Sequence, residues 1–142
     1  MAWVCVPWPV YNTVNGATYP AAGDFDGDGK DELAIGLGTY TTTGGYVEIK
    51  DDAIAGYAHM AWPRIPWPSY NVANGATHPN AGDFDYDGKD ELAIGIGIYT
   101  TKGGYVEIKD DDSAGYAHMD WMWVHWPAYN STNGETRPAL GR

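Results

Sequence analysis

Cysteine is almost absent from this sequence, because Cys5 is its single thiol. One cysteine cannot form an intrachain disulfide, which excludes a small fold held together by a disulfide framework. Basic residues are also few, with eight against 19 acidic residues, and the net charge is −11. Phosphate groups bind to basic faces, so this charge argues against nucleic acid and anionic membrane surfaces as partners. We find no apolar run of the roughly 18 residues that a membrane span needs, and no charged-then-apolar signal-peptide pattern.

Phenylalanine is scarce, at two residues, whereas tryptophan and tyrosine number seven and eleven. Trp and Tyr combine an apolar body with a polar tip, so they suit half-exposed surfaces and ligand platforms. The chain also has 19 glycines and nine prolines without a collagen-like period. Such a composition is typical of many turns between short strands. Because 44% of the 142 residues are hydrophobic, we expect a folded β protein of ordinary domain size.

The sequence repeats itself with a period of 59 residues. Residues 23–36 read GDFDGDGKDELAIG and residues 82–95 read GDFDYDGKDELAIG, so that Asp24 recurs as Asp83. The segments GGYVEIKDD and GYAHM recur at the same offset. We interpret residues 1–142 as a single repeat module. It comprises repeat 1 at about residues 8–66, repeat 2 at about residues 67–125, and a partial repeat 3 at about residues 126–142.

Each full repeat has the pattern of four short strands. In repeat 1 these are residues 17–24, 33–37, 46–50 and 57–62, with a Gly-Gly turn between the second and the third. The second and third alternate with period two, and prolines confine the outer ones to sheet edges or strand starts. No window has convincing helical periodicity. The pattern predicts an all-β fold of tandem four-stranded antiparallel β-propeller blades, as two full repeats plus a partial third.

Each repeat contains an acidic loop whose carboxylates stand at positions one, three, five and nine. Calcium prefers six to eight oxygen ligands, and alternating aspartates in a tight loop aim several carboxylates inward. A glycine at position six permits the sharp turn. The sequence therefore predicts about two Ca²⁺ ions per chain. The predicted ligands are the side chains of Asp24, Asp26, Asp28 and Glu32 with the carbonyl oxygen of Lys30, and the side chains of Asp83, Asp85, Asp87 and Glu91 with the carbonyl oxygen of Lys89.

Two other readings of the acidic loop fit less well. An EF-hand or dockerin loop needs a glutamate at position twelve, where this chain has Ile35 and Ile94 in apolar alternating runs. A solvated acidic turn predicts no spacing rule, although both copies keep all four carboxylates. We expect Asp31 and Asp90 to face solvent, and the acidic runs after the third strands, at residues 51–52 and 110–112, to form solvated turns.

The two segments PAAGDFDGDGKDELAIG and PNAGDFDYDGKDELAIG resemble FG-GAP repeats, also called VCBS repeats, of integrin-alpha-type β-propellers. This resemblance covers both full repeats. It implies that the acidic loop joins the first two strands of a blade and binds calcium. It also implies an extracellular or cell-surface location. Members of the family include cell-adhesion propellers and lectins that bind sugars between blades.

A second repeated motif, WPxYNxxNG, lies outside the acidic loops. Stacking aromatics beside amides is a common way to hold a sugar, whereas the alternative is contact between blades with a turn at Asn-Gly. Single histidines at 59 and 118 lack neighbours for a zinc site, and we expect them to hydrogen-bond within a strand. The candidate ligand-binding residues of the motif are Trp8, Tyr11, Asn12, Trp67, Tyr70, Asn71, Trp126, Tyr129 and Asn130.

No residue pattern supports catalysis. Serines at 69, 113 and 131 do not recur at equivalent positions, and the paired carboxylates are assigned to metal. We expect a non-enzymatic calcium-binding module that acts in binding or self-assembly. The alternatives are a lectin and a structural or designed repeat scaffold. Two blades would leave two apolar faces open, so we expect self-association through blade faces, as a ring of two to four chains or a filament.

Overall fold

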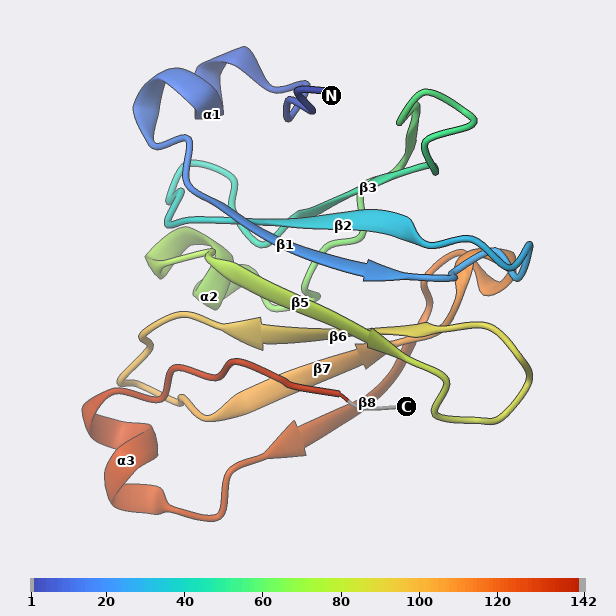
Figure 1. Cartoon of the computed structure of the whole chain (residues 1–142). Helices are drawn as coiled ribbons and strands as arrows, with labels where there is room; N and C mark the ends of the chain where they lie inside the picture. Colours follow the sequence, from blue (N-terminus) through green and yellow to red (C-terminus); the bar gives the residue numbers. More distant parts are fainter. Residues whose placement is uncertain (1, 141–142) are drawn as a thin grey trace.

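The computed structural model describes residues 2–140, which form two four-stranded antiparallel sheets. In each sheet the strands lie in sequence order, so every neighbouring pair is joined by a simple connection. Figure 1 shows the two sheets stacked one upon the other. The first sheet contains β1 (Thr18–Gly23), β2 (Glu32–Leu37), β3 (Val47–Lys50) and β4 (His59–Ala61). The second contains β5 (Thr77–Gly82), β6 (Glu91–Ile96), β7 (Tyr105–Lys109) and β8 (His118–Trp123).

The expected strands are therefore present, and the chain is mostly β. Four strands in each 59-residue repeat are the number that a propeller blade needs. Two sheets do not by themselves close a ring, so the propeller arrangement stays a prediction. None of the helices described is long and apolar enough to cross a membrane.

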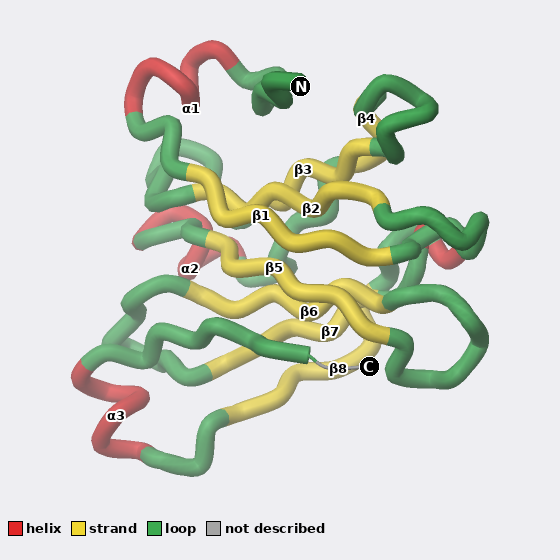
Figure 2. The backbone as a smooth tube through the Cα atoms, in the orientation of Figure 1, coloured by secondary structure: helices red, strands yellow, loops and turns green. Residues whose placement is uncertain are grey.

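Short helices are the feature that the sequence analysis missed. The motif WPxYN forms a six-residue α-helix in each of its three copies, α1 (Pro9–Val14), α2 (Pro68–Ala73) and α3 (Pro127–Thr132) (Figure 2). Proline occupies the first turn of each helix, where its fixed φ and missing N–H are tolerated. A six-residue helix that buries one or two side chains has no detectable period, which is why the expectation of no helix was wrong. A further 3₁₀ turn spans Asp112–Ala114.

The main core lies between the two sheets. One face of the first sheet presents Ala34, Val47 and Ile49, and the facing side of the second sheet presents Leu92 and Ile94. Each fully buried aliphatic side chain of this kind contributes about 1.5–3 kcal/mol to folding. The sheets approach so closely that a Cβ at Gly23 would lie 2.3 Å from the Cβ of Ala81.

Parts of the two outer faces are covered, although we expected both faces to be open. Val6 and Tyr11 from the N-terminal segment cover the outer face of the first sheet, where Ile35 and Leu37 are buried. On the far face of the second sheet, residues 134–140 run where the first strand of a third blade would lie. There the Thr136 carbonyl is 2.2 Å from the Cβ position of Gly95. The N-terminal segment and the partial repeat 3 thus supply some of the cover for which we expected other chains.

Candidate metal centre

Both acidic loops lie at the same end of the sheets. They connect β1 to β2 and β5 to β6, and Figure 1 shows them at the end opposite to the three helices. In each loop four carboxylates offer oxygens that all lie within 4.8 Å of one another. These are the predicted sets, namely Asp24, Asp26, Asp28 and Glu32 in the first loop and Asp83, Asp85, Asp87 and Glu91 in the second.

Hydrogen bonds within the loop explain why it folds in this way. The carboxylate of Asp24 accepts from the backbone N–H of Gly27 at 2.8 Å and of Gly29 at 3.0 Å. Asp26 accepts in turn from the N–H of Asp28 at 3.0 Å. Such aspartate-to-backbone bonds fold a short segment into a turn without help from a ladder. The aspartates therefore shape the loop and leave their remaining lone pairs for a cation.

The glutamate at position nine closes each cluster from the strand side. Glu32 is 1% exposed, and its Oε2 accepts from the N–H of Phe25 at 2.7 Å and of Asp26 at 3.3 Å. Its Oε1 is buried and lacks a hydrogen-bond partner among the described residues, and the same holds for Oε1 of Glu91. Burial, followed by the charges of Asp26 and Asp24, raises the pKa of Glu32 to about 7. Burial also raises the pKa of Glu91.

These features fit a divalent oxygen-seeking cation. A buried carboxylate oxygen without a partner is costly, and a bound cation removes that cost. Four carboxylates in a tight, glycine-containing loop supply hard oxygen ligands, which suit calcium better than zinc. The carbonyl oxygens of Lys30 and Lys89 stay predicted ligands.

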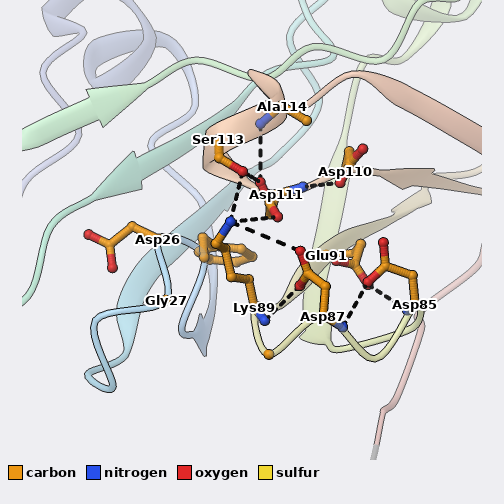
Figure 3. A network of polar contacts seen from close by, with 12 residues as sticks. Asp26, Gly27, Asp85, Asp87, Lys89, Glu91, Asp110, Asp111, Ser113 and Ala114 are labelled. Atoms are coloured by element: carbon orange, nitrogen blue, oxygen red, sulfur yellow. Dashed lines mark hydrogen bonds and ion pairs between the residues drawn. The ribbon is translucent and has the colours of Figure 1, made fainter.

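Each loop is tied to the turn that follows the third strand by the lysine at position seven. Lys89 donates from Nζ to the Ser113 hydroxyl at 2.9 Å and pairs with Asp111 at 3.5 Å and with Asp87 at 4.0 Å (Figure 3). In the first loop Lys30 pairs with Asp28 and, at 3.2 Å, with Asp52. The lysine therefore holds its acidic loop against the neighbouring turn.

In the turns after the third strands, Asp52 and Asp111 do not face solvent, contrary to our expectation. Both side chains are buried, and Asp52 accepts from the N–H groups of Ile54 and Ala55 at 2.7 and 2.9 Å. The bond from Ala55 is the largest cause that holds the pKa of Asp52 below its usual value, followed by Lys30 and Ile54. An aspartate that caps a turn from inside cannot face solvent at the same time.

The expectation that Asp90 faces solvent is also wrong. Asp90 is 3% exposed, its Oδ2 accepts from the N–H of Asp24 at 3.0 Å, and its own N–H donates to the Asp24 carbonyl at 2.8 Å. Phe25 is fully buried against Tyr116, with ring centroids 5.9 Å apart. The first loop is thus interlocked with the second repeat. Asp31 is exposed, as expected.

Most tyrosines and asparagines of the WPxYNxxNG motif form hydrogen bonds with the backbone. The Tyr70 hydroxyl is buried, donates to the Ala76 carbonyl at 2.6 Å and accepts from the N–H of Gly97 at 2.7 Å. Asn71 is buried and donates to the Ile65 carbonyl at 2.7 Å, and Asn130 does the same with Val124. Tyr11 is also buried, and its hydroxyl accepts from the backbone N–H of Gly38. These groups fix the helix and the turn after it.

Two tryptophans of the motif, Trp8 and Trp67, line two pockets that sequence reasoning missed. The first pocket, of about 510 Å³, is lined by Pro7, Trp8, Thr43, Tyr46 and Trp62. The second, of about 250 Å³, is lined by Pro66, Trp67, Lys102, Tyr105 and Trp121. Each residue of one pocket has its counterpart 59 positions away in the other. That recurrence of aromatic residues was the available signal, but it does not show which of them share a face.

Residues 20–47 match the FG-GAP repeat. The matched segment runs from β1 through the first acidic loop to the start of β3, and it confirms the resemblance. The 59-residue offset places the equivalent sequence of the second repeat at residues 79–106. No curated protein and no solved structure matches the chain. An FG-GAP repeat is typical of propeller-type binding modules.

Proposed function

We propose that this chain is a non-enzymatic, calcium-binding module built from propeller-type blades, and that it acts outside the cell in binding or assembly. Each acidic loop holds one Ca²⁺ through its four carboxylates. Weak sites of this kind, with Kd of roughly 10⁻⁴–10⁻³ M or tighter, match the calcium level around extracellular modules. The ion would fasten the loop that joins the first two strands of each blade.

One observation carries this proposal. Two equivalent clusters each contain a buried glutamate oxygen without a hydrogen-bond partner among the described residues, next to three aspartates. In a solvated acidic turn such an oxygen would be in contact with water, and in an ion pair it would be in contact with a lysine. Lys30 and Lys89 instead reach the outer aspartates and the neighbouring turn. A cation between the carboxylates explains both facts.

Neutralising one glutamate at a time tests the two sites separately. Glu32→Gln and Glu91→Gln keep the side-chain shape but remove one charged ligand, so each variant should retain one calcium site and lose the other by at least tenfold in affinity. Equilibrium dialysis with ⁴⁵Ca measures both the stoichiometry and the affinity. Asp31→Asn, which changes an exposed acid of the same loop, is the matched control and should keep both sites. Unchanged binding in both glutamate variants would refute this ligand set.

Carbohydrate binding is the second candidate function, and the pair of aromatic pockets favours it. In each pocket a half-buried tryptophan meets a tyrosine and a second tryptophan edge to face, with ring centroids between 5.6 and 6.0 Å apart. Such rings offer apolar faces to the C–H groups of a pyranose. The tryptophans rather than the buried tyrosines would contact the sugar.

Intrinsic tryptophan fluorescence tests the sugar proposal. A sugar in these pockets should shift or quench the emission, and Trp62→Phe together with Trp121→Phe should reduce that response. Trp3 is 96% exposed and outside both pockets, so Trp3→Phe is the control. A glycan panel without any response would exclude the lectin function and leave the rings a role in folding.

A further inference from the structure

Three segments of the chain share one sequence pattern and one conformation. We call residues 6–20 the N-terminal arm, residues 65–79 the central arm and residues 124–138 the C-terminal arm. The cap residues Trp8, Trp67 and Trp126 have φ of −139°, −137° and −142°. In each arm an asparagine amide donates to a backbone carbonyl six residues earlier, at 2.8, 2.7 and 2.7 Å.

The central arm binds both sheets. Toward the first sheet, the Thr77 hydroxyl donates to the Tyr46 carbonyl and accepts from the N–H of Leu37, each at 2.8 Å. Toward the second sheet, the Tyr70 hydroxyl accepts from Gly97 at 2.7 Å, and the Asn74 amide donates to the Ile98 carbonyl at 3.0 Å. The arm is therefore a two-sided connector between a preceding and a following sheet.

The two outer arms each use one of these sides. The N-terminal arm forms its hydrogen bonds with the following sheet, where Tyr11 accepts from Gly38 at 2.7 Å and Asn15 donates to Thr39 at 2.9 Å. The C-terminal arm forms its hydrogen bonds with the preceding sheet. There the Thr136 hydroxyl donates to Tyr105 at 2.6 Å and accepts from Ile96 at 2.8 Å. The described residues include no sheet on its other side.

On its exposed side, the first repeat carries the counterparts of the residues through which the second repeat packs against the first sheet. Thr77, Ala81 and Asp90 are buried against the first sheet, and their counterparts Thr18, Ala22 and Asp31 are exposed. The opposite end is complementary, because Phe25 is fully buried in the junction whereas its counterpart Phe84 is 40% exposed. Both halves of one more junction are therefore present, at opposite ends of the chain.

We propose that the first sheet of one copy docks on the second sheet of another copy, with its N-terminal arm in the place of the partner's C-terminal arm. The junction repeats the one within the chain: Thr18 replaces Thr136 on Tyr105, and Asp31 accepts from Asp83. The C-terminal arm forms the same two threonine hydrogen bonds within its own chain, so it competes with the incoming copy. Because an attached segment has a high effective concentration, association depends on protein concentration and on how firmly that arm is held.

Variants at the two ends have opposite predicted effects, which separates this junction from unspecific association. Thr136→Ala removes two hydrogen bonds of the C-terminal arm and should shift association to about tenfold lower protein concentration. Ala22→Glu places a charge on the docking face, where it is exposed in a single chain, and should abolish association alone and in combination with Thr136→Ala. Val72→Glu is the control, because Val72 is 57% exposed on the central arm even between two sheets.

Light scattering after size exclusion, over a wide concentration range, measures the mass of each variant. Multiples of 15.4 kDa for Thr136→Ala, and 15.4 kDa for the double variant, would support the junction. The proposal is overturned if Thr136→Ala stays at 15.4 kDa throughout, or if Ala22→Glu leaves its association unchanged. Circular dichroism verifies folding. Leu140→Asp loosens the segment that directly follows this arm, where Leu140 lies next to Gly82, and it replaces Thr136→Ala if that variant unfolds.

Discussion

At the scale of single residues, the glycine at position six of the acidic loop has a purely conformational role. Gly88 has φ of 95°, and a Cβ built on it would meet no atom within 4 Å. Gly88→Ala should therefore lower the free energy of unfolding by about 1–2 kcal/mol through backbone strain alone. Urea denaturation measures this loss. The reverse change, Tyr86→Gly, serves as control: Tyr86 has φ of 65° where the first loop has Gly27, so stability should not fall. Equal losses in both variants would contradict this explanation.

The glutamate at position nine should make the proposed calcium binding depend on pH. The pKa of Glu32 is raised to about 7 by burial and by the nearby aspartates, so the carboxyl is partly protonated at neutral pH. Calcium requires the ionised form, and the proton must leave on binding. Affinity should therefore rise from about pH 6 to about pH 8. Calorimetry in buffers of different ionisation enthalpy would show the released proton. The same affinity at both pH values would exclude Glu32 as a ligand.

At the scale of elements, two aspartates at equivalent positions of the acidic loops differ in their contacts, because only one of them lies in the junction between the repeats. Asp90 is buried and accepts from the Asp24 N–H, whereas Asp31 is exposed. A hydrogen bond to a charged group is worth about 1.5–3 kcal/mol, so Asp90→Ala should destabilise the chain by that order. Asp31→Ala should change stability by less than about 0.5 kcal/mol. Chemical denaturation measures the free energy of unfolding of both variants. Similar losses in the two would mean that the hydrogen bond between Asp24 and Asp90 contributes nothing to stability.

The strands and the acidic loops could be predicted because their signals are local. Alternation along β2 and β3, the Gly-Gly turn and the carboxylate spacing each fix a structure within a few residues. The helices could not, since α1, α2 and α3 are too short to have a period. The burial of Asp90 was equally hidden, because Asp90 packs against the first repeat and the described residues include no such neighbour for Asp31. The burial of Asp52 and Asp111 depends on contacts with the loop lysine and the turn backbone of their own repeats.

At the scale of the whole molecule, the chain alternates arms and sheets. Each sheet is covered on one side by the arm before it and on the other by the arm after it. Sequence reasoning divided the chain at its 59-residue period. It did not show that the N-terminal segment and the partial repeat 3 cover parts of the outer sheet faces, because that needs the register of residues 134–140 on β6. Calcium would act on the same scale, since both loops fasten the end of the sheets opposite to the helices.

Calorimetric titration of the chelator-treated chain with Ca²⁺ tests the central claim most directly. The two acidic loops have the same ligands and the same geometry, so we predict two sites per chain of similar affinity. Mg²⁺ should compete poorly, because it demands a stricter octahedral site. A titration without heat or saturation under these conditions would contradict the assignment of both loops as calcium sites.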